Sequence, residues 1–75
     1  MKYEFELEYK KIGLKIAYYR KLEGLTQEML AERLGVATSY IGQIEAAGMY
    51  KPISLTTLLR ISQALDIPAY KFLEF

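Results

Sequence analysis

The sequence contains neither cysteine nor histidine, and these two absences exclude several kinds of function. Without cysteine the chain has no disulfide bond and no thiolate metal site. Without histidine it lacks the commonest general base and metal ligand of proteins. No glycine-rich phosphate-binding loop and no plausible catalytic cluster of carboxylates takes their place. We therefore expect no enzyme, no metal site and no cofactor.

Long apolar runs are absent as well. No stretch approaches the roughly 20 apolar residues that a membrane-spanning helix needs. The first residues, MKYEFE, alternate charged and aromatic side chains, unlike the apolar core of a secretory signal. With 75 residues there is room for one domain. These features predict a cytoplasmic protein that contacts no membrane.

Charge is unevenly distributed, although the net charge is only +1. Glu4, Glu6 and Glu8 make the beginning of the chain acidic, whereas the stretch from Lys10 to Lys21 contains several basic residues and no acid. A local basic stretch favours contact with phosphate more than the total charge suggests. The same pattern is equally typical of a solvated helix face, so the stretch alone does not decide between the two.

The spacing of apolar residues predicts an all-α fold. Ile12, Ile16 and Tyr19 recur at helical intervals and predict a first helix that ends near Gly24. Thr26 is a good N-cap for a second helix, whose inner face consists of Leu30, Ala31 and Leu34. A third helix is expected over residues 38–46.

Two more helices are expected after a loop. Ser54 caps the fourth, for which we expect a core face of Leu55, Leu58, Leu59 and Leu65. Pro68 suits the first turn of a short fifth helix that contains Tyr70, Phe72 and Leu73. The prediction is a compact bundle of about five helices over residues 10–75, preceded by an extension over residues 1–9.

The extension admits two interpretations. Tyr3, Phe5, Leu7 and Tyr9 alternate with charged residues, which is typical of a strand. Alternatively, Phe5 and Tyr9 continue the phase of Ile12 and extend the first helix backwards. We favour the helix, because the chain offers no convincing second strand and an unpaired strand leaves its backbone groups unsatisfied. A strand would have to pair with another copy of the protein.

The stretch from Thr26 to Glu45 has the pattern of two short helices crossed at a tight turn. Ala31 is small where the helices must approach each other, and Gly35 stands where the chain leaves the first of them. Ile41 and Ile44 supply the buried face of the second, with Val36 in the turn. This pattern predicts a helix-turn-helix, whose second helix enters the major groove of DNA in proteins of that kind.

From Ile12-Gly13 to Leu73 the chain resembles the phage repressor and Cro type of helix-turn-helix domain. The resemblance is carried by Leu25-Thr26-Gln27-Glu28, Leu30-Ala31-Glu32-Arg33-Leu34-Gly35-Val36, Tyr40-Ile41, Ile44-Glu45, Pro52 and Leu65-Asp66-Ile67. It implies a bundle of about five helices that binds double-stranded operator DNA, usually as a dimer or as the DNA-reading part of a larger regulator.

The resemblance also implies roles for single residues. Thr38, Ser39 and Gln43 face base edges, where glutamine pairs with adenine and hydroxyls contact either base type. Gln27 opens the second helix, where free N–H groups favour a phosphate. Tyr40 either stacks on the DNA backbone or fills an apolar seam. Lys15 and Lys51 are candidate phosphate contacts, and Arg20 and Glu45 match a pair that ties the first helix to the end of the third.

Two departures from the family pattern support a second hypothesis. Ala37 stands where Ser or Thr usually caps the recognition helix, and residues 38–50 contain no Lys or Arg. The leading prediction is a sequence-specific DNA-binding regulator of transcription. The alternative is an antitoxin-like or accessory module that binds protein, with weak or no DNA binding. No small-molecule substrate is evident. A surplus of aromatic residues predicts a homodimer through Tyr3, Phe5, Tyr70, Phe72 and Phe75, and the alternative is that these two ends pack on each other within one monomer.

Overall fold

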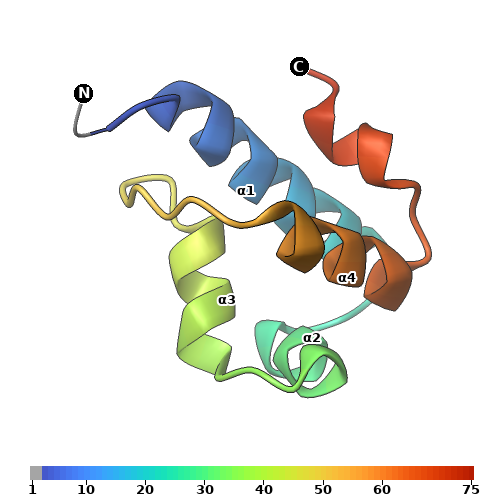
Figure 1. The fold of residues 1–75 in the computed structure, drawn as a ribbon. Coiled ribbons are helices and arrows are strands. Elements are labelled where there is room, and N and C mark those ends of the chain that lie inside the picture. The colour runs from blue at the N-terminus through green and yellow to red at the C-terminus, as the bar shows by residue number, and fades with distance from the viewer. Residues whose placement is uncertain (1–2) are drawn as a thin grey trace.

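The computed structural model describes residues 3–75, which form four α-helices and one 3₁₀ helix. The elements are α1 (Glu6–Leu22), α2 (Gln27–Leu34), α3 (Thr38–Glu45), α4 (Leu55–Leu65) and a closing 3₁₀ helix, η1 (Ala69–Leu73). Figure 1 shows α3 and the C-terminal segment on either side of α1. This part of the chain contains no strand, so the all-α prediction is confirmed and the helix count is close.

The N-terminal extension is helical from Glu6 onward. The α1 helix runs without a break across the boundary expected between residues 9 and 10, and Phe5 precedes it in a left-handed conformation with φ 58°. Glu6 and Lys10 form an ion pair one turn apart, at 3.3 Å. The backward extension of the first helix is therefore confirmed for residues 6–9, and the strand interpretation is wrong for the described part. Met1 and Lys2 lie outside it.

The turn between α2 and α3 has the predicted local chemistry. Thr26 Oγ1 accepts a hydrogen bond from the backbone N–H of Met29 at 3.0 Å and caps α2. Gly35 ends α2 in the left-handed region, with φ 70°. Ala31 is almost fully buried, which lets α3 pack closely. The third helix ends at Glu45, one residue earlier than predicted, because Ala46 has extended backbone angles.

The fourth helix buries a narrower face than predicted. Ser54 caps it as expected, and Leu58, Ile61 and Leu65 enter the core. The predictions for Leu55 and Leu59 were wrong, since these side chains are 68% and 48% exposed. Leu59 directly follows the buried Leu58, so its side chain points to one side of the core face. Leu55 lines a surface pocket instead.

The C-terminal segment closes the core through Phe72. This ring is fully buried and meets Tyr19 of α1 edge to face, with ring centroids 5.5 Å apart. The prediction that Phe72 belongs to an intermolecular contact was therefore wrong, because its apolar area is used within the monomer. Tyr70 and Phe75 remain 59% exposed on either side of it. Within residues 3–75 no helix has the length and apolar character needed to cross a membrane.

Candidate nucleic-acid interface

The α3 helix has one buried and one open face. Ile41 and Ile44 pack into the core, with 0% and 6% of their surface exposed. Thr38 and Ser39 are exposed and Gln43 is half-buried. None of these three polar side chains forms a hydrogen bond with another described residue. Their donors and acceptors are therefore available to a ligand that approaches α3 from outside.

The back of α3 lies directly against the backbone of α1 at Gly13. A Cβ built on Gly13 would overlap the carbonyl oxygen of Ile44, so a glycine is required where the two helices cross. Gly13 belongs to the motif that carries the family resemblance, but sequence reasoning gave it no role of its own. An isolated glycine inside a helical pattern was the available signal, since it costs stability unless packing requires it.

A buried ion pair holds the end of α3 against α1. Arg20 Nε donates to Glu45 Oε2 at 2.8 Å, and Arg20 Nη2 donates to Glu45 Oε1 at 2.9 Å. The two side chains are only 8% and 5% exposed. Arg20 Nη1 donates to the carbonyl oxygen of Leu25 at 2.6 Å, which also anchors the loop before α2. The hydrogen bonds to Glu45 raise the pKa of Arg20 above its usual value, against the opposing effect of burial, so the guanidinium stays charged.

Gln27 adds α2 to this network. Its side-chain Nε2 donates to Glu45 Oε1 at 3.0 Å, so one carboxylate receives bonds from both α1 and α2. Sequence reasoning placed Gln27 at a phosphate and did not foresee this bond. Its amide oxygen lies beside Gly42 of α3. The first turn of α2, where a phosphate contact is predicted, is thus held in a fixed position relative to α3.

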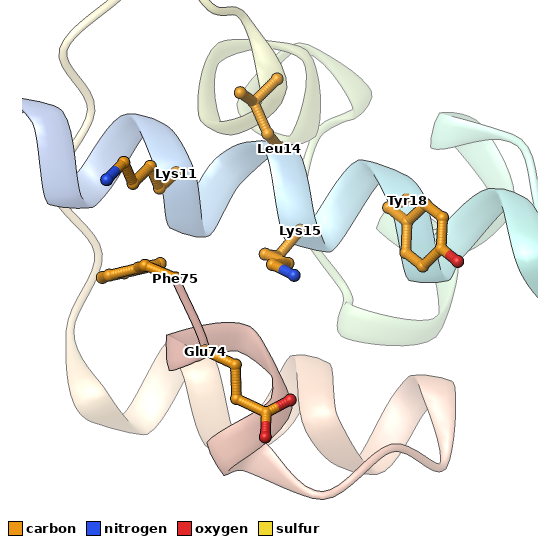
Figure 2. Close-up of a pocket in the computed structure, with 6 residues that line it drawn as sticks. All are labelled: Lys11, Leu14, Lys15, Tyr18, Glu74 and Phe75. Atoms are coloured by element: carbon orange, nitrogen blue, oxygen red, sulfur yellow. The ribbon is translucent and has the colours of Figure 1, made fainter.

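The remaining predicted contacts fall on two different parts of the surface. Lys51 lies next to α3, with its Nζ 5.6 Å from the ring centre of Tyr40, and that ring packs on the core. Lys15 instead lines a pocket between α1 and the C-terminal residues Glu74 and Phe75, to which α3 contributes no lining residue. Figure 2 shows Lys15 on the side of α1 that faces these residues. The structure thus brings Lys51, but not Lys15, together with α3.

The start of α3 has no side-chain cap. Ala37 occupies the N-cap position with extended backbone angles, φ −70° and ψ 145°, and makes no side-chain hydrogen bond. Thr26 and Ser54 have similar angles at the starts of α2 and α4, and both cap with their hydroxyl groups. In α3 the N–H of Tyr40, which a capping hydroxyl would bond, donates instead to the carbonyl oxygen of Ala37 at 3.0 Å.

Comparison with known proteins gives consistent matches over this region. A family model described as helix-turn-helix matches residues 16–72. The transcriptional regulator SinR of Bacillus subtilis (strain 168) is 38% identical over 63 residues, which are 84% of this chain and 56% of SinR. The chain thus spans just over half the length of that regulator.

Two solved structures have the same arrangement of helices. The restriction-modification controller protein C.AhdI from Aeromonas hydrophila superposes with a TM-score of 0.79 at 32% identity, covering 88% of this chain and 97% of that one. The crystal structure of SinR, described as the master regulator for biofilm formation, in complex with DNA gives a TM-score of 0.74 at 38% identity. It covers 84% of this chain and 98% of that one.

Proposed function

The chain belongs to the helix-turn-helix family, and we propose that it is a sequence-specific DNA-binding regulator of transcription that reads the major groove with α3. The observation that carries this proposal is the open face of α3. Thr38, Ser39 and Gln43 lie on it without partners inside the described protein, while the opposite face is fixed in the core. SinR, which is 38% identical, has been crystallised in complex with DNA, and this supports the same kind of ligand here.

The open face of α3 has suitable chemistry for base edges. Gln43 offers a donor and an acceptor together, which match N6 and N7 of adenine. The hydroxyls of Thr38 and Ser39 can contact either base type, and the threonine methyl suits a thymine methyl. The network of Arg20, Glu45 and Gln27 keeps this face in a fixed orientation, so base contacts do not require the helix to reorder on binding.

We assign the phosphate contacts to residues that flank the open face of α3. The first turn of α2 presents Gln27 and free backbone N–H groups, and Lys51 and Tyr40 lie together beside α3. Lys15 can add a contact only where the duplex reaches the far side of α1. Residues 10–75 form the DNA-binding unit in this proposal, and residues 1–9 extend it.

The proposal includes a homodimer on duplex DNA, in the cytoplasm. Twofold-related recognition helices would read half-sites about 34 Å apart. Tyr3, which packs edge to face on Tyr50, and Phe5, Tyr70 and Phe75 are the terminal aromatic residues that remain at least half exposed, and in this proposal they lie at or near the contact between copies.

The test is selection of bound sequences from a random duplex pool, followed by titration of the selected site with the wild type and the Gln43→Ala variant. We expect Gln43→Ala to cost about 1–3 kcal/mol on the selected site and to relax preference at one base pair. Gln63→Ala is the matched control, because Gln63 is an exposed glutamine on α4 and lies outside the proposed interface.

Two outcomes would overturn the proposal. If the pool yields no preferred sequence although the protein binds DNA, α3 does not read bases. If no duplex binds even at low salt, the chain is a protein-interaction module. The absence of Lys and Arg from residues 38–50 is the observation that favours this alternative.

A further inference from the structure

The side of α1 that faces away from the core exposes a row of large apolar residues. Leu7, Leu14, Tyr18 and Leu22 are 60%, 51%, 54% and 65% exposed, and their spacing places them on one face of the helix. We call this row the outer face of α1. Scattered apolar residues are normal on a protein surface, but a continuous row of them marks an interaction site.

A pocket opens along this row. It has a volume of about 360 Å³ and is lined mainly by apolar surface from Lys11, Leu14, Lys15, Tyr18, Glu74 and Phe75. Figure 2 shows Phe75 across the pocket from α1. Lys11 Nζ lies over the Phe75 ring, 5.4 Å from its centre, so a cation–π contact holds these two pocket-lining residues together. The pocket has room for a large apolar side chain from a partner.

Charge along α1 indicates what that partner is. The helix begins with acidic residues, Glu6 and Glu8, just after Glu4, and its later turns hold Lys11, Lys15 and Lys21 with no acid among them. A second α1 in the antiparallel direction would place its acidic end beside the basic end of the first. A parallel α1 would place like charges together. The row is therefore complementary to an inverted copy of itself.

We propose that two copies of the chain pair through the outer faces of α1, antiparallel about a twofold axis between Lys11 and Leu14. Because the row is nearly symmetric about that point, Leu7 of one protomer meets Tyr18 of its partner and enters the pocket bounded by Phe75. The same register brings Glu4 toward the partner's Lys21 and Glu8 toward the partner's Lys15. The contact is isologous, since each protomer supplies the same surface. This inference rests on the homodimer in the proposed function and assigns its interface.

The first test is self-association measured by sedimentation velocity over a range of concentrations. We expect Leu14→Lys to weaken the dimer about tenfold or more, because it places a charge in an apolar contact opposite the partner's Lys11. Leu59→Lys is the matched control, since Leu59 is similarly exposed, at 48%, but lies on α4. Circular dichroism melting would verify that both variants are folded. A monomeric wild type, or equal behaviour of the two variants, would overturn the pairing.

The second test determines the direction of the helices and uses the absence of native cysteine. We expect an oxidised mixture of the single variants Leu7→Cys and Tyr18→Cys to form a disulfide-linked heterodimer, whereas neither variant alone cross-links. Cross-linking of each variant with itself would indicate parallel helices, and no cross-linking in any sample would place the contact elsewhere. Either result overturns the proposal. Wild-type binding to a single half-site is measured separately, so a wrong interface is distinguishable from a failure to bind DNA.

Discussion

At Gly13 the packing of two helices depends on the absence of a side chain. We expect Gly13→Ala to lower the free energy of unfolding by about 1–3 kcal/mol, because the new Cβ overlaps the Ile44 carbonyl and pushes α3 away from α1. Urea unfolding measures the change. Gly42→Ala is the control, since its new Cβ would lie 3.5 Å from the nearest atom, Gln27 Oε1. We expect it to stabilise α3 by up to about 1 kcal/mol. Equal effects of both variants would contradict the close crossing.

Glu45 accepts hydrogen bonds from two other elements, so its removal should affect more than one helix. We expect Glu45→Ala to cost about 3–5 kcal/mol, because it leaves Arg20 charged, buried and without its carboxylate. The melting temperature should fall and DNA binding should be lost in the same variant, since the end of α3 is no longer tied to α1. Glu32→Ala, at an exposed position of α2, should change neither. An unchanged melting temperature for Glu45→Ala would show that the ion pair does not hold the fold.

Single residues were also where sequence reasoning was least complete. It paired Arg20 with Glu45 through the family resemblance, but it did not find the bond from Gln27 to the same carboxylate. It assigned Phe72 to a contact between copies, because the sequence has more aromatic residues than a small core needs. The ring is buried because α1 and η1 enclose it, and such an enclosure depends on how segments distant in sequence come together.

Of the three helices α2, α3 and α4, which share extended backbone angles at the N-cap, α3 lacks a side-chain cap. We expect Ala37→Ser to raise the free energy of unfolding by about 1 kcal/mol, because the backbone angles at Ala37 already suit a capping residue. Ser54→Ala should lower it by a similar amount, since Ser54 Oγ accepts the N–H of Thr57 at 3.1 Å. Thermal melting of the two variants gives the comparison. If Ala37→Ser is neutral while Ser54→Ala lowers stability, the existing bond from the Tyr40 N–H to the Ala37 carbonyl oxygen already satisfies the start of α3.

The order and bounds of the helices were largely predictable because local signals define them. Caps at Thr26 and Ser54 and a left-handed Gly35 fix where α2 begins and ends and where α4 begins. Periodicity alone did not determine how wide a buried face would be. Leu55 and Leu59 are exposed because no other element covers that part of α4. The sequence of one helix does not indicate which other helices pack against it.

For the molecule as a whole, the small net charge limits how strongly any duplex is held. With roughly three to four phosphate contacts, the slope of log affinity against log salt should be about −3 per subunit. We expect Lys51→Ala to reduce the magnitude of this slope by about one. Lys71→Ala is the matched control, because Lys71 also lies over a tyrosine ring, at 5.7 Å, but on η1. If both variants reduce the slope equally, the electrostatic attraction to DNA is spread over the protein surface rather than concentrated beside α3.

The outward residues of α3 contribute little to the fold, and this has a practical consequence. Thr38, Ser39 and Gln43 form no side-chain hydrogen bonds with the described residues, while Gly13, Ile41, Ile44 and Glu45 hold the helix from behind. Substitutions at the three outward positions should therefore affect DNA binding without affecting the residues that hold α3 in the core. A library randomised at the three outward positions, with proline and glycine left out because they destabilise a helix interior, should keep similar melting temperatures while its members differ in the operators they select. The same scaffold is therefore open to retargeting without redesign of its core.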